Sequence, residues 1–450
     1  MFLKKNERNL WMRNNIYPRL ISYILIWVLY LTYMSAFAPL GTDWLTWHFQ
    51  RIYNFSEYLQ INGYFSNFGF SIWSKCQDCS LSSDDWVNRI YLTINIFSYF
   101  PYVLINDFFG SNNFKLYGHL VDKSIIFLAG CLISELLIKL SLKRNDKLYN
   151  FIKAILCFTF FIVNPWTYKM LIASWWIIFF LTFFLLGILM FSKKKNKLGL
   201  ASFFIAGCFD YQSASGVAFF YIVLLAIFSF QNKQHLNKEY FPKIVDNKLI
   251  NFNIIISLMM PIIIYLILRV VASSELEMTN GSSILTRIGI SGNDIHNGGL
   301  LGAIQFLGGN RITQCLMNFD SQIDLMNSSK SIYVYNCILS TLSMFTVSLV
   351  SIIGLFFLNK SDDVFFKLII FPISFLFLSY IFILQQSSSV HLMGYSYFFS
   401  VLFSVGVTTI IFKILKKYNF SLISIFLATP ITIGVIILCI RVSMLTGING

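Results

Sequence analysis

The chain has 450 residues, of which 56% are hydrophobic and 12% are charged, and its net charge is +14 at pH 7. Soluble domains carry about 25% charged residues, so this composition excludes an ordinary soluble enzyme. Apolar runs of about 18 residues or more recur along the chain. Lipid offers the backbone no hydrogen-bond partners, so segments that cross a bilayer are helical. The sequence therefore predicts an all-α integral membrane protein.

The positive charge does not indicate a nucleic-acid partner. It lies in short clusters between the apolar runs: Lys4-Lys5, Lys143-Arg144, Lys193-Lys194-Lys195 and Lys416-Lys417. This pattern is typical of the positive-inside rule. We therefore expect the lipid bilayer of the cytoplasmic membrane as the partner, with the basic clusters and the N-terminus on the cytoplasmic side. Nothing in the sequence indicates the oligomeric state.

We predict a single membrane domain over 1–450 with about eleven spanning helices. They cover 20–40, 119–141, 150–166, 171–191, 198–210, 214–230, 249–271, 331–358, 364–384, 395–415 and 419–441. The helix at 198–210 is short for a span, so we expect it to be tilted or buried within the bundle. With the N-terminus inside, this number places the C-terminus and two large loops, 41–117 and 272–330, on the extracytoplasmic side.

The first large loop contains another apolar run at 90–109. It is long enough to span, but Asn95, Pro101 and Asn106 interrupt it. If it spanned, the basic cluster that follows 119–141 would lie outside, against the positive-inside rule. We therefore expect an interfacial helix on the outer face.

The eight cysteines form no zinc-binding pattern. Cys76 and Cys79 lie in the first large loop and Cys315 lies in the second. If the outer side is oxidising, a disulfide among these three is expected, with its pairing left open.

The most conspicuous ionisable groups beside a predicted helix lie in the segment 41–58. Asp43 follows the first helix where the chain leaves the bilayer, among aromatic residues and close to His48. A carboxylate there could accept a proton from the acceptor hydroxyl in a reaction that uses a lipid-linked substrate. The alternative is a helix end that simply meets water.

A second candidate is the connection Asp210-Tyr211-Gln212. It places a carboxylate, a phenol and an amide on a tight turn between two helices at the outer face, and Gly207 and Gly216 would allow close helix packing. Buried carboxylates in membranes are usually functional, although a polar turn explains these residues equally well.

Three cationic or titratable residues are candidates for phosphate contacts. Arg269 ends the predicted helix 249–271, and arginine suits bidentate phosphate binding. His391 and Lys169 lie on short outer connections. For Lys169, snorkelling to the interface is the alternative.

Several short motifs resemble the GT-C superfamily of membrane glycosyltransferases, in particular those that modify O-antigen. The matching residues are Thr42-Asp43-Trp44 after the first helix, the aromatic run 58–73, Asn164-Pro165-Trp166 and Tyr211-Gln212. The resemblance implies a GT-C-like bundle, a polyprenyl-phosphate-linked sugar as donor and Asp43 as catalytic base. Many members carry two adjacent acids in the first loop, whereas Trp44 follows Asp43 here. Asp84 and Asp85, which are adjacent acids further along the loop, are therefore the rival candidates for the catalytic base.

Two other functions compete with glycosyl transfer. An O-antigen polymerase or ligase would work from the second loop, with Arg287, His296 and Arg311. A flippase or other transporter would carry ionisable residues near mid-membrane, where only Glu135 lies well within a run and pairing with Lys139 would suffice. No residue set indicates a cofactor or a metal site, and transfer with or without a divalent metal is compatible with these residues.

Overall fold

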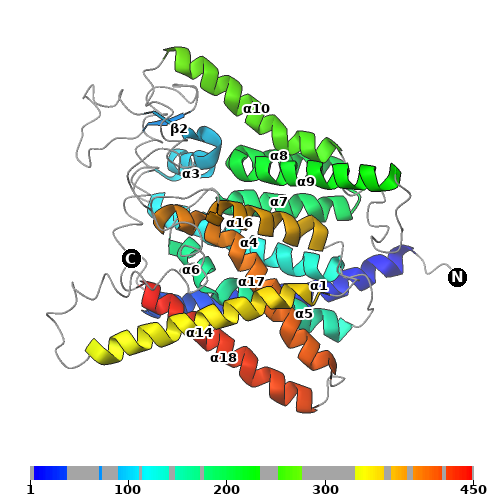
Figure 1. Cartoon of the computed structure of the whole chain (residues 1–450), viewed down its shortest axis with the longest axis vertical. Helices are drawn as coiled ribbons and strands as arrows, with labels where there is room; N and C mark the ends of the chain where they lie inside the picture. Colours follow the sequence, from blue (N-terminus) through cyan, green and yellow to red (C-terminus); the bar gives the residue numbers. More distant parts are fainter. Residues whose placement is uncertain are drawn as a thin grey trace.

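A computed structural model describes residues 5–37, 70–72, 90–110, 114–140, 147–172, 177–233, 252–275, 330–358, 366–382, 389–417 and 422–447. This part of the chain is almost entirely helical, in agreement with the predicted all-α class (Figure 1). The only strands described form one short antiparallel pair.

Each predicted spanning segment overlaps a helix. The helices are α1 (Lys5–Phe37), α3 (Ile96–Phe109), α4 (Phe114–Lys139), α5 (Lys147–Val163), α6 (Pro165–Ile172), α7 (Ile177–Ser192), α8 (Asn196–Phe209), α9 (Tyr211–Lys233), α10 (Phe252–Glu275), α14 (Lys330–Phe356), the π-helical turn η5 (Phe366–Ile370), α16 (Phe371–Phe382), α17 (Ser389–Lys417) and α18 (Leu422–Gly447).

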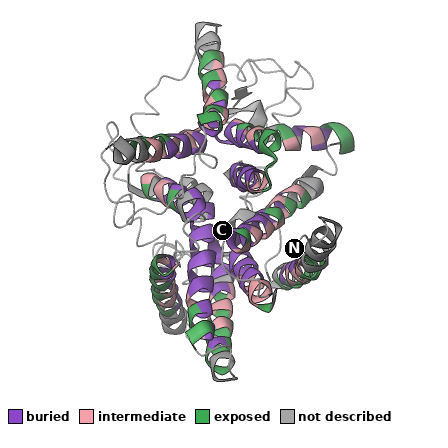
Figure 2. Ribbon diagram, turned by 90° about the vertical axis from the view of Figure 1, so that its right-hand side faces the viewer, coloured by how far each residue is buried: buried purple, intermediate pink, exposed green. Residues whose placement is uncertain are grey.

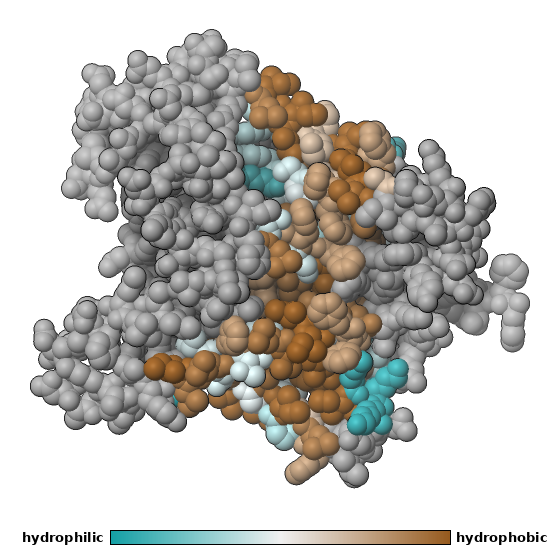
Figure 3. All heavy atoms as spheres, in the orientation of Figure 1, coloured by the Kyte–Doolittle hydropathy of each residue, from teal (hydrophilic) through white to brown (hydrophobic). Residues whose placement is uncertain are grey.

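The helices are apolar enough for a membrane protein. In the described residues, three segments are long and apolar enough to cross a bilayer: Ile338–Phe356, Tyr397–Lys417 and Phe426–Ser443. Several shorter helices are apolar as well. Large apolar side chains such as Leu29 and Phe426 point outward, with 70% and 76% of their surface exposed. Figure 3 shows hydrophobic side chains over most of the described face, as expected of a surface that meets lipid.

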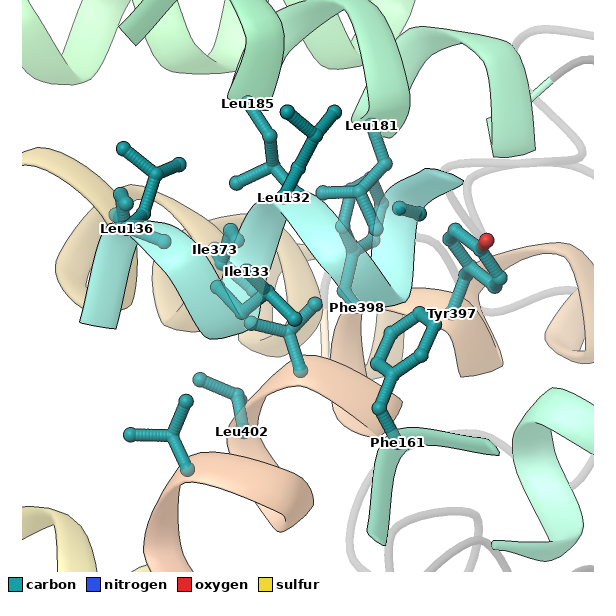
Figure 4. Packing of buried hydrophobic residues seen from close by; sticks show 14 of the residues in the cluster. Leu132, Ile133, Leu136, Phe161, Leu181, Leu185, Ile373, Tyr397, Phe398 and Leu402 are labelled. Carbon is teal, nitrogen blue, oxygen red and sulfur yellow. The ribbon is translucent and has the colours of Figure 1, made fainter. Parts of the chain in front are cut away.

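Helix α17 is the centre of the bundle. It packs against α5, α6, α14, α16 and α18, and its side chains are buried from Tyr397 to Thr409. Buried residues gather in the middle of the molecule and exposed ones on the peripheral helices (Figure 2). Apolar side chains of α4, α7 and α17 interdigitate in this core (Figure 4).

Close packing at the two predicted glycines is confirmed. A Cβ on Gly207 of α8 would lie 3.0 Å from the carbonyl oxygen of Leu258 and 2.9 Å from Pro261 Cγ, both in α10. A Cβ on Gly216 of α9 would lie 2.5 Å from the Leu376 side chain in α16. The short helix α8 is half-buried between α7 and α10, so the expectation that the bundle covers it is partly met.

The run at 90–109 differs from its prediction in its first part. β2 (Ile90–Asn95) pairs antiparallel with β1 (Phe70–Ile72), and only the following residues form the helix α3. β-branched residues such as Ile90, Thr93 and Ile94 favour the strand. Helix α3 has 14 residues, or about 21 Å at 1.5 Å per residue, which is too short for a hydrocarbon layer of about 30 Å.

Helix α3 lies at one end of the bundle, together with α6 and the α8–α9 turn (Figure 1), and it packs against α4 and α8. We call this the α3 end. The α7–α8 turn at 193–195 and the last turn of α17, with Lys416 and Lys417, lie at the opposite end.

An ion pair near the opposite end corrects one prediction. Glu135 of α4 pairs with Arg19 of α1 and not with Lys139. Arg19 Nε and Nη2 donate to its two carboxylate oxygens at 2.7 and 2.9 Å. The Tyr23 hydroxyl donates to the same carboxylate at 3.1 Å. The charge pair therefore joins the first helix to the bundle.

Candidate functional site

The α8–α9 turn holds the predicted group Asp210-Tyr211-Gln212 in a defined geometry. Asp210 has extended backbone angles and is 4% exposed. Its Oδ1 accepts hydrogen bonds from the backbone N–H groups of Gln212 at 3.1 Å and Ser213 at 3.3 Å. The Ser213 hydroxyl donates to Oδ2. These are the bonds of a helix N-cap, so Asp210 begins α9 and fixes the two residues that follow it.

Burial and capping act on the Asp210 carboxyl in opposite directions. Burial raises its pKa above the ordinary value, while the hydrogen bonds from Ser213 and Gln212 favour the ionised form and oppose that shift. Because the carboxylate oxygens already accept three hydrogen bonds, we assign Asp210 a positioning role.

Substitutions at Asp210 separate its cap from its charge. Asparagine caps a helix about as well as aspartate, whereas alanine does not, and loss of a cap costs about 1 kcal/mol. We expect Asp210→Ala to lower the thermal midpoint of the purified protein and Asp210→Asn to leave it close to wild type. Circular dichroism melts in detergent measure both. Equal losses in the two variants would mean that the charge, and not the cap, stabilises this turn.

The two residues after the cap contact α10. The rings of Tyr211 and Tyr265 stack with their centroids 4.0 Å apart and their planes at 17°, and their hydroxyls are hydrogen-bonded. Gln212 is a further hydrogen-bond partner of Tyr211. Arg269 follows Tyr265 by one helical turn of α10, although its side chain lies outside the described part of the structure. An amide and an aromatic face here suit the recognition of hydroxylated groups.

A second group of polar residues surrounds the break between α5 and α6. Asn164 is 0% exposed, and its Nδ2 donates to the carbonyls of Phe160 and Phe161 at 2.8 and 2.7 Å. Its Oδ1 accepts from the Thr167 N–H at 2.8 Å and from the Ser400 hydroxyl of α17 at 3.1 Å. The Asn164 side chain therefore hydrogen-bonds two carbonyl groups near the end of α5, caps α6 and links both helices to the central helix α17.

The sequence explains this break. Pro165 lacks an N–H and is tolerated at the first position of a helix, directly after an asparagine that caps well. The prediction that Lys169 lies on a turn is wrong, because it belongs to helix α6. His391 was also expected in a connection, and it lies in the first turn of α17. The side chains of both residues lie outside the described part.

Sequence reasoning missed the buried carboxylate of this second group. Asp122 of α4 is 2% exposed and interacts electrostatically with the Tyr397 phenol of α17, which is 0% exposed. Because α4 begins at Phe114, Asp122 lies about 12 Å along that helix at 1.5 Å per residue. Hydropathy placed it at the edge of a span, and no motif marked it.

The structure brings some of the predicted site residues together and leaves others untested. Asp210, Tyr211 and Gln212 form one group, and α3 packs against both α8, which ends next to Asp210, and α4, which carries Asp122. Several residues lie outside the described part: Asp43, His48, Asp84, Asp85, Arg287, His296, Arg311 and the loop cysteines Cys76, Cys79 and Cys315. Within the described ranges, no three His, Cys, Asp or Glu side chains form a group that could hold a metal ion.

Comparisons with protein-family models, with curated proteins and with solved structures give no match for this chain. The site is therefore interpreted from its own residues and geometry.

Proposed function

We propose that this protein is a membrane glycosyltransferase of the GT-C type. It would transfer a sugar from a polyprenyl-phosphate donor to a glycan, lipid or protein acceptor at the extracytoplasmic face. The observation that carries the proposal is the position of α3. This helix is too short to span and follows the Asp43 loop, and it lies at one end of the bundle against α4 and α8. The resemblance implies the same arrangement: one long helix, then an acidic outer loop with an interfacial helix, and then a helical bundle.

The finer topology is part of the proposal: eleven spanning helices, a cytoplasmic N-terminus and an extracytoplasmic C-terminus. The distribution of charge supports it. Lys139 and Lys193 lie close enough to interact electrostatically, and Lys416 and Lys417 end α17 at the same end of the bundle. Basic residues accumulate on the cytoplasmic side, so the α3 end would face outward.

In the proposed reaction, a hydroxyl oxygen of the acceptor bonds to the anomeric carbon of the donor sugar. The bond from that carbon to the phosphate oxygen breaks, and the polyprenyl phosphate leaves with the bonding electrons. The Asp43 carboxylate takes the proton of the acceptor hydroxyl. Arg269, with His391, His48 and Lys169 as further candidates, would bind the phosphate. Tyr211 and Gln212, fixed by the Asp210 cap, would contact the sugar.

Translocation of a lipid-linked sugar is the second candidate, and one observation favours it. Asp122 is a buried carboxylate well inside α4, and transporters place such groups along their substrate paths.

One experiment separates the two candidates. The purified protein is reconstituted into proteoliposomes with a polyprenyl-phosphate hexose that is labelled in the sugar, and with extracted lipid-linked glycans as acceptors. Glycosyl transfer moves the label into a larger product with a new glycosidic bond. Translocation changes only the leaflet in which the intact donor lies. The transferase proposal is refuted if the label moves to the other leaflet but stays in the intact donor.

A further inference from the structure

Buried hydroxyl groups without a hydrogen-bond partner gather around α6. Within the described part of the chain, Tyr397 Oη and Thr167 Oγ1 have none, and both residues are 0% exposed. A third such group, the Tyr30 hydroxyl of α1, lies near Tyr168, the residue after Thr167. Each buried polar group that lacks a partner costs about 1–3 kcal/mol, so their concentration at one place calls for a physical reason.

Hydroxyls elsewhere in the bundle do not behave in this way. Ser134, Thr182, Ser404 and Thr408 are as deeply buried, and each donates to a carbonyl three or four residues earlier, at 2.6–2.9 Å. This is the ordinary arrangement of serine and threonine in helices. The groups around α6 are therefore exceptions within the described bundle.

Thr167 and Tyr397 belong to one small region. The Thr167 N–H and the Ser400 hydroxyl share the same acceptor, Asn164 Oδ1. Tyr397 lies three residues before Ser400 and so on the same side of α17. Its ring packs edge-on against Phe161, with centroids 5.7 Å apart, and its hydroxyl points away from that ring (Figure 4).

The chemistry of this region suits a neutral ligand that carries hydroxyl groups. Asp122 supplies a buried carboxylate within electrostatic range of Tyr397, and a carboxylate only accepts hydrogen bonds and repels phosphate. The two hydroxyls can donate or accept. Sugar hydroxyls match both demands, because each can donate to the carboxylate and accept from a phenol or a threonine.

We propose that Tyr397, Thr167 and Asp122 bind the hydroxyl groups of a neutral carbohydrate at the α3 end of the bundle. The identification of the ligand as a carbohydrate rests on the proposed function. Among the residues that the structure describes, the two hydroxyls have no hydrogen-bond partner, and the bound ligand supplies one. A site of this kind discriminates strongly for a hydroxylated ligand, since any other occupant leaves the buried groups unsatisfied.

The test compares hydroxyls without a partner with hydroxyls that have one. The site variants are Tyr397→Phe and Thr167→Val. The matched controls are Tyr221→Phe and Thr408→Val, because the Tyr221 hydroxyl donates to the Leu368 carbonyl at 2.9 Å and the Thr408 hydroxyl donates to the Ser404 carbonyl at 2.6 Å. Methyl glycosides of common hexoses and N-acetylhexosamines are titrated against each protein in nanodiscs, and inorganic phosphate is titrated as the charged comparison.

We expect at least one glycoside to bind the wild-type protein and each site variant to bind it about 10-fold more weakly or worse, as for loss of a buried hydrogen bond. The thermal midpoint of the ligand-free site variants should equal or exceed that of the wild type. The controls should bind as wild type, with a lower midpoint for Tyr221→Phe. The proposal fails if no glycoside binds, or if Tyr397→Phe and Thr167→Val bind it normally.

The outcome for this site is separable from that of the proposed function. If the wild type transfers sugar and both site variants keep its KM for donor and acceptor, the carbohydrate site is wrong and the transferase stands. If glycoside binding depends on the two hydroxyls while the wild type forms no glycosidic bond, the site stands and the transferase is wrong.

Discussion

Replacing Asp43 with asparagine should lower the rate of sugar transfer about 100-fold or more. The substitution keeps the size of the side chain and its ability to hydrogen-bond, but removes the group that takes the proton of the acceptor hydroxyl. General bases contribute about 10²–10⁴-fold to enzymatic rates. Since the chemical step alone is affected, kcat should fall with little change in the KM for the donor. The rate is measured in proteoliposomes as label that enters the glycosylated product.

Two matched substitutions serve as controls for Asp43→Asn. Asp84 and Asp85 are the paired acids of the same loop, so Asp84→Asn and Asp85→Asn test the rival assignment with the same chemical change. We expect both to transfer sugar at close to the wild-type rate. If Asp43→Asn is fully active while either rival is inactive, the catalytic base belongs to the later acid. Equal circular dichroism spectra exclude misfolding as the cause.

Glu135→Ala should cause the largest loss of stability, about 2–3 kcal/mol. It leaves the Arg19 guanidinium, 12% exposed, without the carboxylate that binds it through two hydrogen bonds. Charged hydrogen bonds contribute about 1.5–3 kcal/mol, and an unpaired buried charge costs more. Both residues lie near the end of the bundle opposite α3, where the guanidinium can snorkel toward water, so the loss stays below that of a fully buried pair. Thermal melts of the protein in detergent measure it.

Removing both partners should cost less than removing one. The double variant Arg19→Met with Glu135→Met has no uncompensated charge, so we expect it to melt above Glu135→Ala. Tyr23→Phe removes only the 3.1 Å bond to the same carboxylate and should lower stability by about 1 kcal/mol. If Glu135→Ala melts as the wild type does, the pair does not hold α1 to the bundle.

The helical framework was predictable because its signals are local. Each predicted apolar segment overlaps a helix, although the turn expected around Lys169 is the helix α6. Gly207 and Gly216 indicated close packing that the structure confirms. The sequence Asn164-Pro165 also marks a boundary, since proline cannot continue a helix and asparagine caps one well. Local chemistry does not show that the same asparagine also binds Ser400 on a helix more than 200 residues away.

The features that sequence reasoning missed depend on contacts distant in the chain. Arg19 and Glu135 are 116 residues apart, and only the packing of α1 on the bundle selects Arg19 over the nearby Lys139. Asp122 is buried because neighbouring helices pack around α4, which hydropathy cannot register. The strand at 90–95 forms because β1 is available to pair with it, although the run reads equally well as a helix.

The side of the membrane that α3 faces provides the most direct test, because every group assigned to the site lies at that end or in the loop before it. Asp107 of α3 and Lys195 of the α7–α8 turn are both exposed and lie at opposite ends of the bundle. Asp107→Cys and Lys195→Cys are made separately in a chain whose native cysteines are replaced by serine, and intact cells are treated with a membrane-impermeant maleimide. We predict that Asp107→Cys reacts in intact cells and that Lys195→Cys reacts only after permeabilisation. The reverse pattern would place the site on the cytoplasmic side and contradict transfer at the extracytoplasmic face.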